Sequence, residues 1–213
     1  MLRLDESSNT LCNSASGQQF DSVSRTWAPS SRIPGGIDVS PVAAATWLQR
    51  RSGHPQKQPV AVIGPREANS DQLATAEALG HALATIGFSV VCGGRQGIMN
   101  EVCRGVASAN GISIGLLPEA DTSHANAYVT VPIATGIGEA RNALVARAGF
   151  CLVAIGDSYG TLSEVALGLQ FGRPVIGLCG AAQVAGVHHL ASVEAAIDEI
   201  AAIALGMPAF GTK

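Results

Sequence analysis

The chain has 213 residues, of which 47% are hydrophobic and 14% charged, and it contains 25 glycines. This length and composition allow one α/β domain with a substantial core and an additional segment, but not a second full domain. The net charge is −3 and the basic residues are scattered, which argues against nucleic acid as a partner. No segment has the roughly 18 uninterrupted apolar residues of a membrane helix, and the first residues lack the apolar region of a signal peptide. We therefore expect a cytoplasmic protein with no membrane partner.

Residues 1–56 differ in composition from the rest of the chain. They are rich in Ser, Pro, Gly and Asn, and their only helix-like stretch is 42–49. We predict that this segment is an irregular or disordered N-terminal arm. Trp27 and Trp47 both lie in it, which suggests that part of the arm docks on the domain or on a partner subunit.

From residue 57 onward, apolar runs and helical patterns alternate. Runs without polar alternation, typical of strands buried on both faces of a parallel sheet, occur at residues 60–63, 89–92, 113–117, 129–133, 151–155 and 175–178. Helical periodicity follows at residues 71–86, after residue 97, after residue 138, at 161–171 and at 193–205. The alternation predicts right-handed βαβ crossovers and a doubly wound, Rossmann-like α/β domain over residues 57–213, with helices on both faces of the sheet.

The five cysteines and five histidines show no metal-binding pattern. The cysteines form no CxxC pair and the histidines lack HExxH spacing. The adjacent His188 and His189 would point in different directions on a strand or a helix. We expect buried, reduced cysteines and no metal site.

Three glycine-rich loops each follow a predicted strand and precede a helix. This position places them at the carboxyl edge of the sheet, where such folds bind ligands. Their backbone N–H groups, and those that begin the next helix, suit a phosphate, although each loop alone is equally explained as a tight turn. The predicted ligand-binding residues are Gly64, Gly93, Gly94, Arg95, Gly97, Thr135, Gly136, Gly138, Arg141, Asn142, Gly156, Asp157, Ser158, Tyr159, Gly160, Thr161 and Glu164.

Arg141 and Glu164 each have two interpretations. A cation is unfavourable in the first turn of a helix, so Arg141 needs a partner. It is either a surface arginine paired with Glu139 or Glu164, or a residue whose guanidinium donates paired hydrogen bonds to a phosphate or carbonyl of a ligand. Asn142 could add a polar contact or cap the helix. Thr161 and Glu164 have the spacing of a capping box, and capping and a role in the site carry equal weight for Glu164.

Segments 93–118, 135–142 and 159–178 resemble the LOG-like Rossmannoid family, which includes proteins labelled possible lysine decarboxylases and cytokinin-activating phosphoribohydrolases. The chain is most similar to the bacterial branch that resembles molybdenum cofactor carrier proteins, and the resemblance spans most of residues 58–205. It implies a homodimer or homotetramer. It also implies that Arg141 and Glu164, which match the catalytic arginine and glutamate of the hydrolases, line the ligand site.

The chain departs from the hydrolase signature PGGxGTxxE, because it has Gly156-Asp157-Ser158 in place of Pro-Gly-Gly. The Asp157 carboxylate would repel a bound phosphate unless it faced away or contacted another part of the ligand. Arg141 is followed by asparagine, as in the carrier-like branch, where the hydrolases have lysine.

We therefore predict a protein that binds a small phosphorylated ligand, a nucleotide or a molybdopterin-type cofactor, and that requires no other cofactor. The alternative is a phosphoribohydrolase that cleaves the N-glycosidic bond of nucleoside 5′-monophosphates, with Arg141 and Glu164 as its catalytic residues. A third interpretation, single-strand DNA binding, rests on a looser resemblance to DNA-processing protein A. The negative charge and scarce aromatic residues weigh against it.

Overall fold

The computed structural model describes residues 1–30 and 35–207. The chain divides into two compact units. One is the domain Lys57–Ala196, and the other joins Met1–Gln56 to the C-terminal stretch that begins at Ile197. The sequence predicted a Rossmann-like domain over residues 57–213, and the compact unit that contains the parallel sheet ends at Ala196. Among the described residues, no helix has the length and apolarity needed to cross a membrane.

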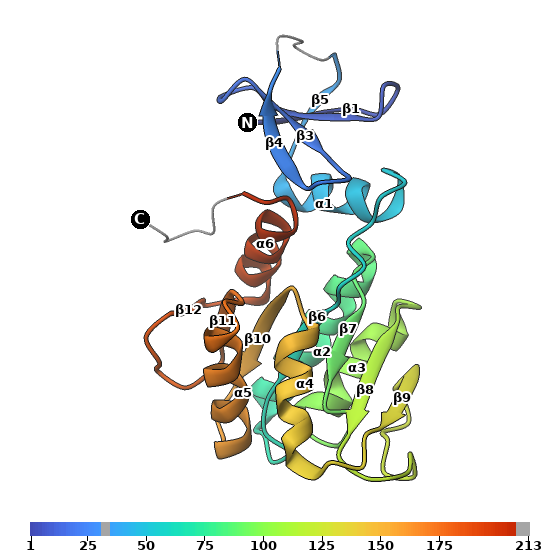
Figure 1. Cartoon of the computed structure of the whole chain (residues 1–213), viewed down its shortest axis with the longest axis vertical. Helices are drawn as coiled ribbons and strands as arrows, with labels where there is room; N and C mark the ends of the chain where they lie inside the picture. The colour runs from blue at the N-terminus through green and yellow to red at the C-terminus, as the bar shows by residue number, and fades with distance from the viewer. Residues whose placement is uncertain (31–34, 208–213) are drawn as a thin grey trace. The chain divides into compact units, whose positions relative to one another are not determined.

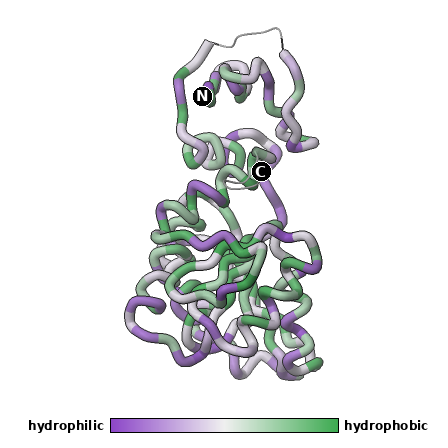
Figure 2. Tube along the Cα trace, turned by 90° about the vertical axis from the view of Figure 1, so that its left-hand side faces the viewer, coloured by the Kyte–Doolittle hydropathy of each residue, from purple (hydrophilic) through white to green (hydrophobic). Residues whose placement is uncertain are grey.

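The domain is built on a parallel sheet in the order β12-β11-β10-β6-β7-β8-β9, and every pairing in it is parallel (Figure 1). The strands are β6 (Val60–Ile63), β7 (Val90–Cys92), β8 (Ser113–Leu117), β9 (Val131–Ala134), β10 (Cys151–Ile155), β11 (Val175–Leu178) and β12 (Val187–His189). All residues of β6, β7, β10 and β11 are buried, which explains why these strands appear in the sequence as unbroken apolar runs. Figure 2 shows hydrophobic segments of the chain, in green, gathered in the interior of the domain.

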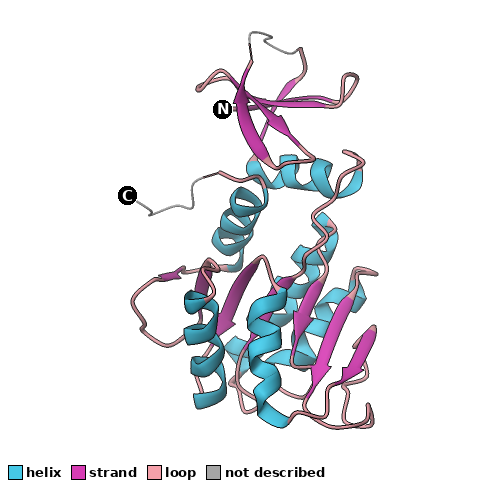
Figure 3. Cartoon of the chain, viewed as in Figure 1, coloured by secondary structure: helices cyan, strands magenta, loops and turns pink. Residues whose placement is uncertain are grey.

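Helices cover both faces of this sheet (Figure 3). They are α2 (Ser70–Ile86), α3 (Ile98–Ser108), the 3₁₀ helix η1 (Gly138–Arg141), α4 (Asn142–Ala148), α5 (Tyr159–Gln170) and α6 (Val193–Ala204). The chain moves from β6 through α2, β7 and α3 to β8 in one direction, and from β10 through α5 to β11 in the other. Because such crossovers are right-handed, the two directions place α2 and α3 on the face opposite α5. The predicted doubly wound α/β fold is confirmed.

The direction of the chain reverses between β6 and β10, which are neighbours in the sheet although about ninety residues apart in the sequence. Loops that leave two such strands diverge to opposite faces and leave a crevice between them at the carboxyl edge. This topological switch point fixes where the domain offers a site.

The N-terminal unit contains an antiparallel sheet in the order β4-β3-β2-β1-β5, followed by a helix. Its elements are β1 (Leu2–Asp5), β2 (Thr10–Asn13), β3 (Gln18–Asp21), β4 (Thr26–Pro29), β5 (Ile37–Val39) and α1 (Pro41–Arg50). We expected an irregular or disordered arm here. The segment is a separate unit, as expected, but it carries regular secondary structure and only the helix-like stretch at 42–49 was predicted.

An eight-residue repeat builds the first four strands, which begin at residues 2, 10, 18 and 26. Asp5, Asn13 and Asp21 end a strand and accept hydrogen bonds from backbone N–H groups of the following turn. Asn9, Gly17 and Arg25 then take positive φ angles of 51°, 65° and 57° before the next strand. A four-residue turn ending in the left-handed region is a common hairpin connection, so the polar composition of this segment reflects turns rather than disorder.

A small core holds this unit together. Apolar side chains of the sheet pack with those of α1, and the buried members are Leu2, Leu4, Leu11, Phe20, Ala44, Trp47, Leu48 and Leu205. The Trp27 indole donates to the Leu205 carbonyl at 2.7 Å, and the Trp47 indole donates to Asn9 Oδ1 at 2.9 Å. Both tryptophans therefore serve this unit's own core.

Candidate ligand-binding pocket

A pocket of about 730 Å³ opens at the carboxyl ends of β6 and β10, at the switch point of the sheet. Its walls come from the loop after β6, the end of β7, the η1–α4 junction and the first turns of α5. The lining residues are Ile63, Gly64, Pro65, Arg66, Glu67, Gly93, Met99, Glu139, Arg141, Asn142, Asp157, Ser158, Tyr159, Gly160, Thr161, Ser163 and Glu164.

One wall of the pocket is the N-terminus of α5. Ser158 is the N-cap in an extended conformation, with φ −164°, and its Oγ accepts from the Thr161 backbone N–H at 3.1 Å. The remaining N–H groups of the first helical turn have no intrahelical acceptor and carry the positive end of the helix dipole. The capping-box interpretation of Thr161 and Glu164 is wrong, because the helix begins before Thr161 and Ser158 supplies the cap. The Glu164 side chain is therefore free for another role.

Arg141 ends η1 and directs its guanidinium into the domain, where the side chain is 5% exposed. Its Nη1 lies 3.5 Å from Glu164 Oε1 and also donates to Asn142 Oδ1. Its Nε has no hydrogen-bond partner among the described residues. Arg141 is thus a buried arginine with donor capacity to spare, rather than the surface arginine of the alternative interpretation.

Gly93 makes room for this arginine. A Cβ at Gly93 would lie 2.7 Å from Arg141 Nη2 and 2.7 Å from Met99 Sδ, closer than real Cβ contacts. The absence of a side chain lets the guanidinium pack directly on the backbone at the end of β7. A side chain at this position would displace the ends of Arg141 and Met99, so the glycine favours the observed place of the guanidinium.

Glu164 is buried, and burial raises its pKa to about 8. The dominant cause is loss of hydration of the charged form. The Arg141 guanidinium opposes the rise, and the like charge of Glu139 adds to it. At neutral pH the Glu164 carboxyl is therefore mostly protonated, so it can donate a hydrogen bond into the pocket and it adds little negative charge there.

The structure brings together the predicted site residues at Gly64, Gly93, Arg141, Asn142, Asp157, Ser158, Tyr159, Gly160, Thr161 and Glu164. Asp157 is exposed at the pocket wall. The predicted residues that do not line the pocket are Gly94, Arg95, Gly97, Thr135, Gly136, Gly138 and Gly156.

The glycines outside the pocket serve backbone geometry. Gly94, Gly97 and Gly156 have φ angles of 73°, 68° and 68°. A Cβ at Gly97 would lie 2.3 Å from the Arg66 carbonyl oxygen, and one at Gly156 would lie 2.6 Å from Gln72 Nε2. These residues shape the loops that form the pocket without facing it.

The loop at 135–138 directs its donors to the protein itself. Thr135, Gly136 and Gly138 donate their N–H groups to carbonyl oxygens of residues 117–119, at 2.9 to 3.0 Å. The Arg95 guanidinium is likewise engaged by a carboxylate, at 3.1 Å. The prediction that this loop converges on the ligand site with the other two therefore does not match the pocket.

Sequence reasoning missed several residues of the lining, namely Ile63, Pro65, Arg66, Glu67, Met99, Glu139 and Ser163. Of this lining, the loop after β6 could have been predicted from the sequence. It follows the first strand of a doubly wound sheet, where a switch point with a later strand is expected. Glu139 was considered in the sequence only as a partner of Arg141, because its place in the pocket depends on the 3₁₀ turn that holds it.

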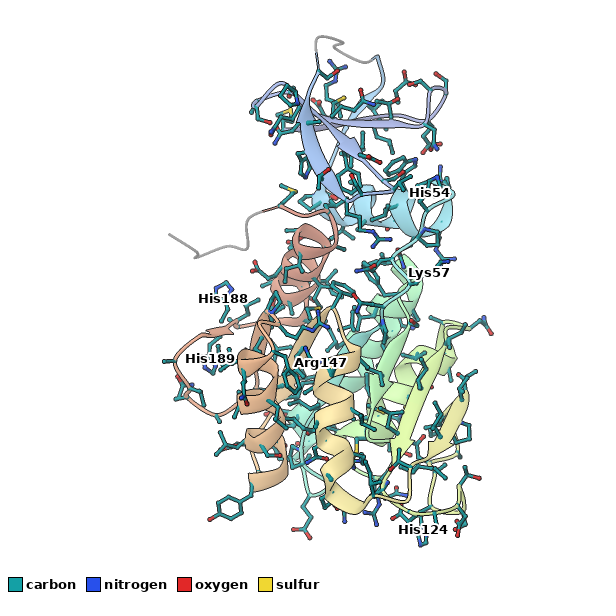
Figure 4. The ribbon with its side chains drawn as sticks, viewed as in Figure 1. His54, Lys57, His124, Arg147, His188 and His189 are labelled. Atoms are coloured by element: carbon teal, nitrogen blue, oxygen red, sulfur yellow. The ribbon has the colours of Figure 1, made fainter. Side chains whose placement is uncertain are left out.

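The titratable sulfur and imidazole groups do not form a metal site. Among the described residues, no group of three or more His, Cys, Asp or Glu side chains could hold a metal ion. His188 and His189 lie at the β12 edge of the domain, whereas His124 lies toward the β9 edge (Figure 4). All five cysteines are free, and Cys12, Cys92, Cys103 and Cys151 are buried.

Residues 57–202 match the model of the SLOG cluster4 family, and the chain belongs to this family. The molybdenum cofactor binding protein of Rippkaea orientalis is similar at 33% identity, covering 70% of this chain and 98% of that one, with a TM-score of 0.66. The molybdenum cofactor carrier protein of Chlamydomonas reinhardtii is similar at 34% identity, with the same coverages and a TM-score of 0.63.

Two further relatives add less about function. An uncharacterized protein of Archaeoglobus fulgidus is 29% identical over 139 residues, which are 65% of this chain and 91% of that one. DNA processing protein A of Streptococcus pneumoniae is 16% identical, with a TM-score of 0.54, and shares the fold alone. The family and the resemblance to carrier proteins agree with the relationship inferred from the sequence.

Proposed function

We propose that this protein binds a small phosphorylated ligand, a nucleotide or a phosphorylated pterin-type cofactor, in the pocket at the switch point, and holds it in the manner of a cofactor carrier. The observation that carries the proposal is the buried Arg141 guanidinium, which lines the pocket beside the N-terminus of α5. Together they give a fixed cation and a row of backbone donors on one wall, which is the chemistry that recognises a phosphate.

The start of α5 supports a phosphate at the backbone. Gly160 lines the pocket, and a Cβ there would meet nothing nearer than 3.8 Å, so the space beside its backbone is open. A ligand oxygen can approach the first-turn N–H groups of the helix closely, because no side chain stands in front of them. Asp157 is exposed at this wall, where its carboxylate can face away from the bound anion.

The floor of the pocket supports recognition of an uncharged polar part of the ligand. With its raised pKa, Glu164 offers a carboxylic acid rather than a carboxylate at neutral pH. Asn142 Nδ2 is held by Ser163 Oγ at 3.2 Å, which fixes a second polar group on the same wall. Hydroxyl or ring-nitrogen acceptors of a nucleoside or pterin match such donors.

Similarity to proteins described as binding or carrying the molybdenum cofactor supports the carrier form of the proposal. The likeness covers nearly the whole length of those proteins, so it includes the strands and loops that form the pocket here.

The test is calorimetric titration of the full chain with adenosine and guanosine 5′-monophosphates, together with oxidation and fluorescence detection of any copurifying pterin. Gly160→Ala should weaken binding at least about tenfold, because the new methyl group occupies the space beside the helix N-terminus. Gly168→Ala on the same helix is the matched control, since its Cβ meets only ordinary contacts at 3.4 Å or more. Equal binding by wild type and Gly160→Ala would show that the ligand does not sit at this helix.

A second candidate function is hydrolysis of the N-glycosidic bond of a nucleoside 5′-monophosphate. The observation in its favour is the protonated Glu164 next to Arg141, because an acid with a pKa near neutrality can protonate a leaving base. Incubation with nucleoside monophosphates and detection of free base tests it. If free base is released by wild type but not by Glu164→Ala, hydrolysis is the function rather than cofactor binding. If the nucleotide stays intact after prolonged incubation, binding remains the function.

A further inference from the structure

Three arginines, two of which line the pocket, lie around the lining residue Glu139. Arg66 Nη2 lies 3.0 Å from Glu139 Oε1, and Arg95 Nη1 lies 3.9 Å from the same oxygen. Arg141 Nη2 lies 3.9 Å from Glu139 Oε2. The arginines come from three different loops, after β6, after β7 and at the end of η1, so the fold rather than local sequence brings them to one point.

Glu139 differs in setting from the arginines that it contacts. Its side chain is 64% exposed, whereas those of Arg66, Arg95 and Arg141 are 48%, 22% and 5% exposed. An exposed carboxylate keeps most of its hydration, and its ion pairs contribute little to stability. It can therefore be displaced at small cost, while the arginines that surround it remain in place.

The contacts to Glu139 are also loose. Only the Arg66 contact is within hydrogen-bonding distance, and the two at 3.9 Å are attractions between charges without a hydrogen bond. Arg95 has a closer partner in Glu119, at 3.1 Å. A side-chain carboxylate thus satisfies this group of cations poorly, and a group with more oxygens would fit it better.

We infer that Arg66, Arg95 and Arg141 form a second anion subsite, and that the Glu139 carboxylate occupies it as a stand-in until a ligand displaces it. The inference rests on the proposed function, in which a first phosphate lies at α5. The ligand class that it specifies carries a second oxyanion group besides that phosphate. Guanidinium groups suit such a group because their planar donors match phosphate-like oxygens in pairs.

The test uses inorganic pyrophosphate as the probe, titrated calorimetrically into the full chain at low ionic strength. Glu139→Gln should bind pyrophosphate about tenfold more tightly than wild type, because the competing charge is gone while the arginines stay. Glu67→Gln is the charge-matched control. Glu67 lines the same pocket but forms no ion pair with these arginines, so its gain should stay below about twofold and should vanish at high salt.

A second variant separates displacement from general electrostatics. Adding Arg66→Gln to Glu139→Gln should return the affinity for pyrophosphate to the wild-type level or below. Equal gains from Glu139→Gln and Glu67→Gln, or a gain that survives loss of Arg66, would overturn the inference. If nucleoside monophosphates bind alike to wild type and Gly160→Ala, the proposed function fails, whereas the pyrophosphate comparison still decides the subsite.

Discussion

Replacing Glu164 by glutamine should remove a specific pH dependence of the domain's stability. The pKa of this carboxyl rises from 4.5 to about 8 on folding. The folded domain therefore binds the proton more tightly than the unfolded chain, by on the order of 5 kcal/mol. Between these two pH values the folded state holds one proton more, so the free energy of unfolding falls by up to about 1.4 kcal/mol for each pH unit of increase. This contribution is complete below pH 4.5 and is lost as the pH rises through about 8.

Glutamine has nearly the same shape as the protonated glutamate and does not titrate. Glu164→Gln should therefore match wild type within about 1 kcal/mol near pH 5 and exceed it in stability above pH 8. Urea unfolding followed by far-ultraviolet circular dichroism from pH 4.5 to 8.5 measures the difference. Tryptophan fluorescence is unsuitable, because Trp27 and Trp47 both lie in the N-terminal unit. Glu67→Gln is the control, since it leaves Glu164 in place and should keep the wild-type slope.

Identical slopes for wild type and Glu164→Gln would refute this account of the buried pair. A carbon-13 titration of the Glu164 carboxyl gives an independent measure in the folded protein. A midpoint near pH 8 is expected, and a midpoint near pH 5 would mean that the Arg141 guanidinium outweighs burial and that the pair is ionised at neutral pH.

Two further substitutions test the packing of each unit. Gly93→Ala should weaken ligand binding while it destabilises the domain by no more than about 1 kcal/mol, because the new methyl group meets the flexible ends of Arg141 and Met99 at 2.7 Å and displaces the guanidinium. Calorimetry with adenosine 5′-monophosphate and thermal unfolding measure the two effects, and an unchanged affinity would contradict this account. Trp27→Phe should destabilise the N-terminal unit by about 1 kcal/mol, because it removes the indole hydrogen bond to the Leu205 carbonyl. The remaining tryptophan fluorescence reports that unfolding, and unaltered stability would show that the bond contributes nothing.

The inner strands of the parallel sheet were predictable because they are buried on both faces. Such strands need apolar residues at every position, so runs such as residues 151–155 are visible in the sequence. β12 (Val187–His189) has no such apolar run and was missed, because it is only half-buried and two of its residues are histidines. In the N-terminal unit each of the first four strands has four residues and each turn between them is polar, so composition suggested disorder where the eight-residue spacing would have indicated hairpins.

The spacing of Thr161 and Glu164 illustrates how a local pattern can have the wrong meaning. It fits a capping box, but the extended backbone of Ser158 starts the helix earlier and leaves Glu164 one turn inside it, facing the pocket. The sequence cannot show this, because a helix start is set by the backbone angles that the preceding strand and loop impose.

The sequence by itself determined the kind of fold, because hydrophobic periodicity is a property of the chain. Its glycine loops predicted a site at the carboxyl edge of the sheet, and its family resemblance predicted that Arg141 and Glu164 line that site. Only the tertiary structure decided which loops meet there. The reversal of strand order between β6 and β10 brings the loop after β6 and the start of α5 to one crevice, and it turns the loop at 135–138 toward the protein's own carbonyl groups. Burial then sets the charge of Glu164, since the loss of water that raises its pKa exists only in the folded domain.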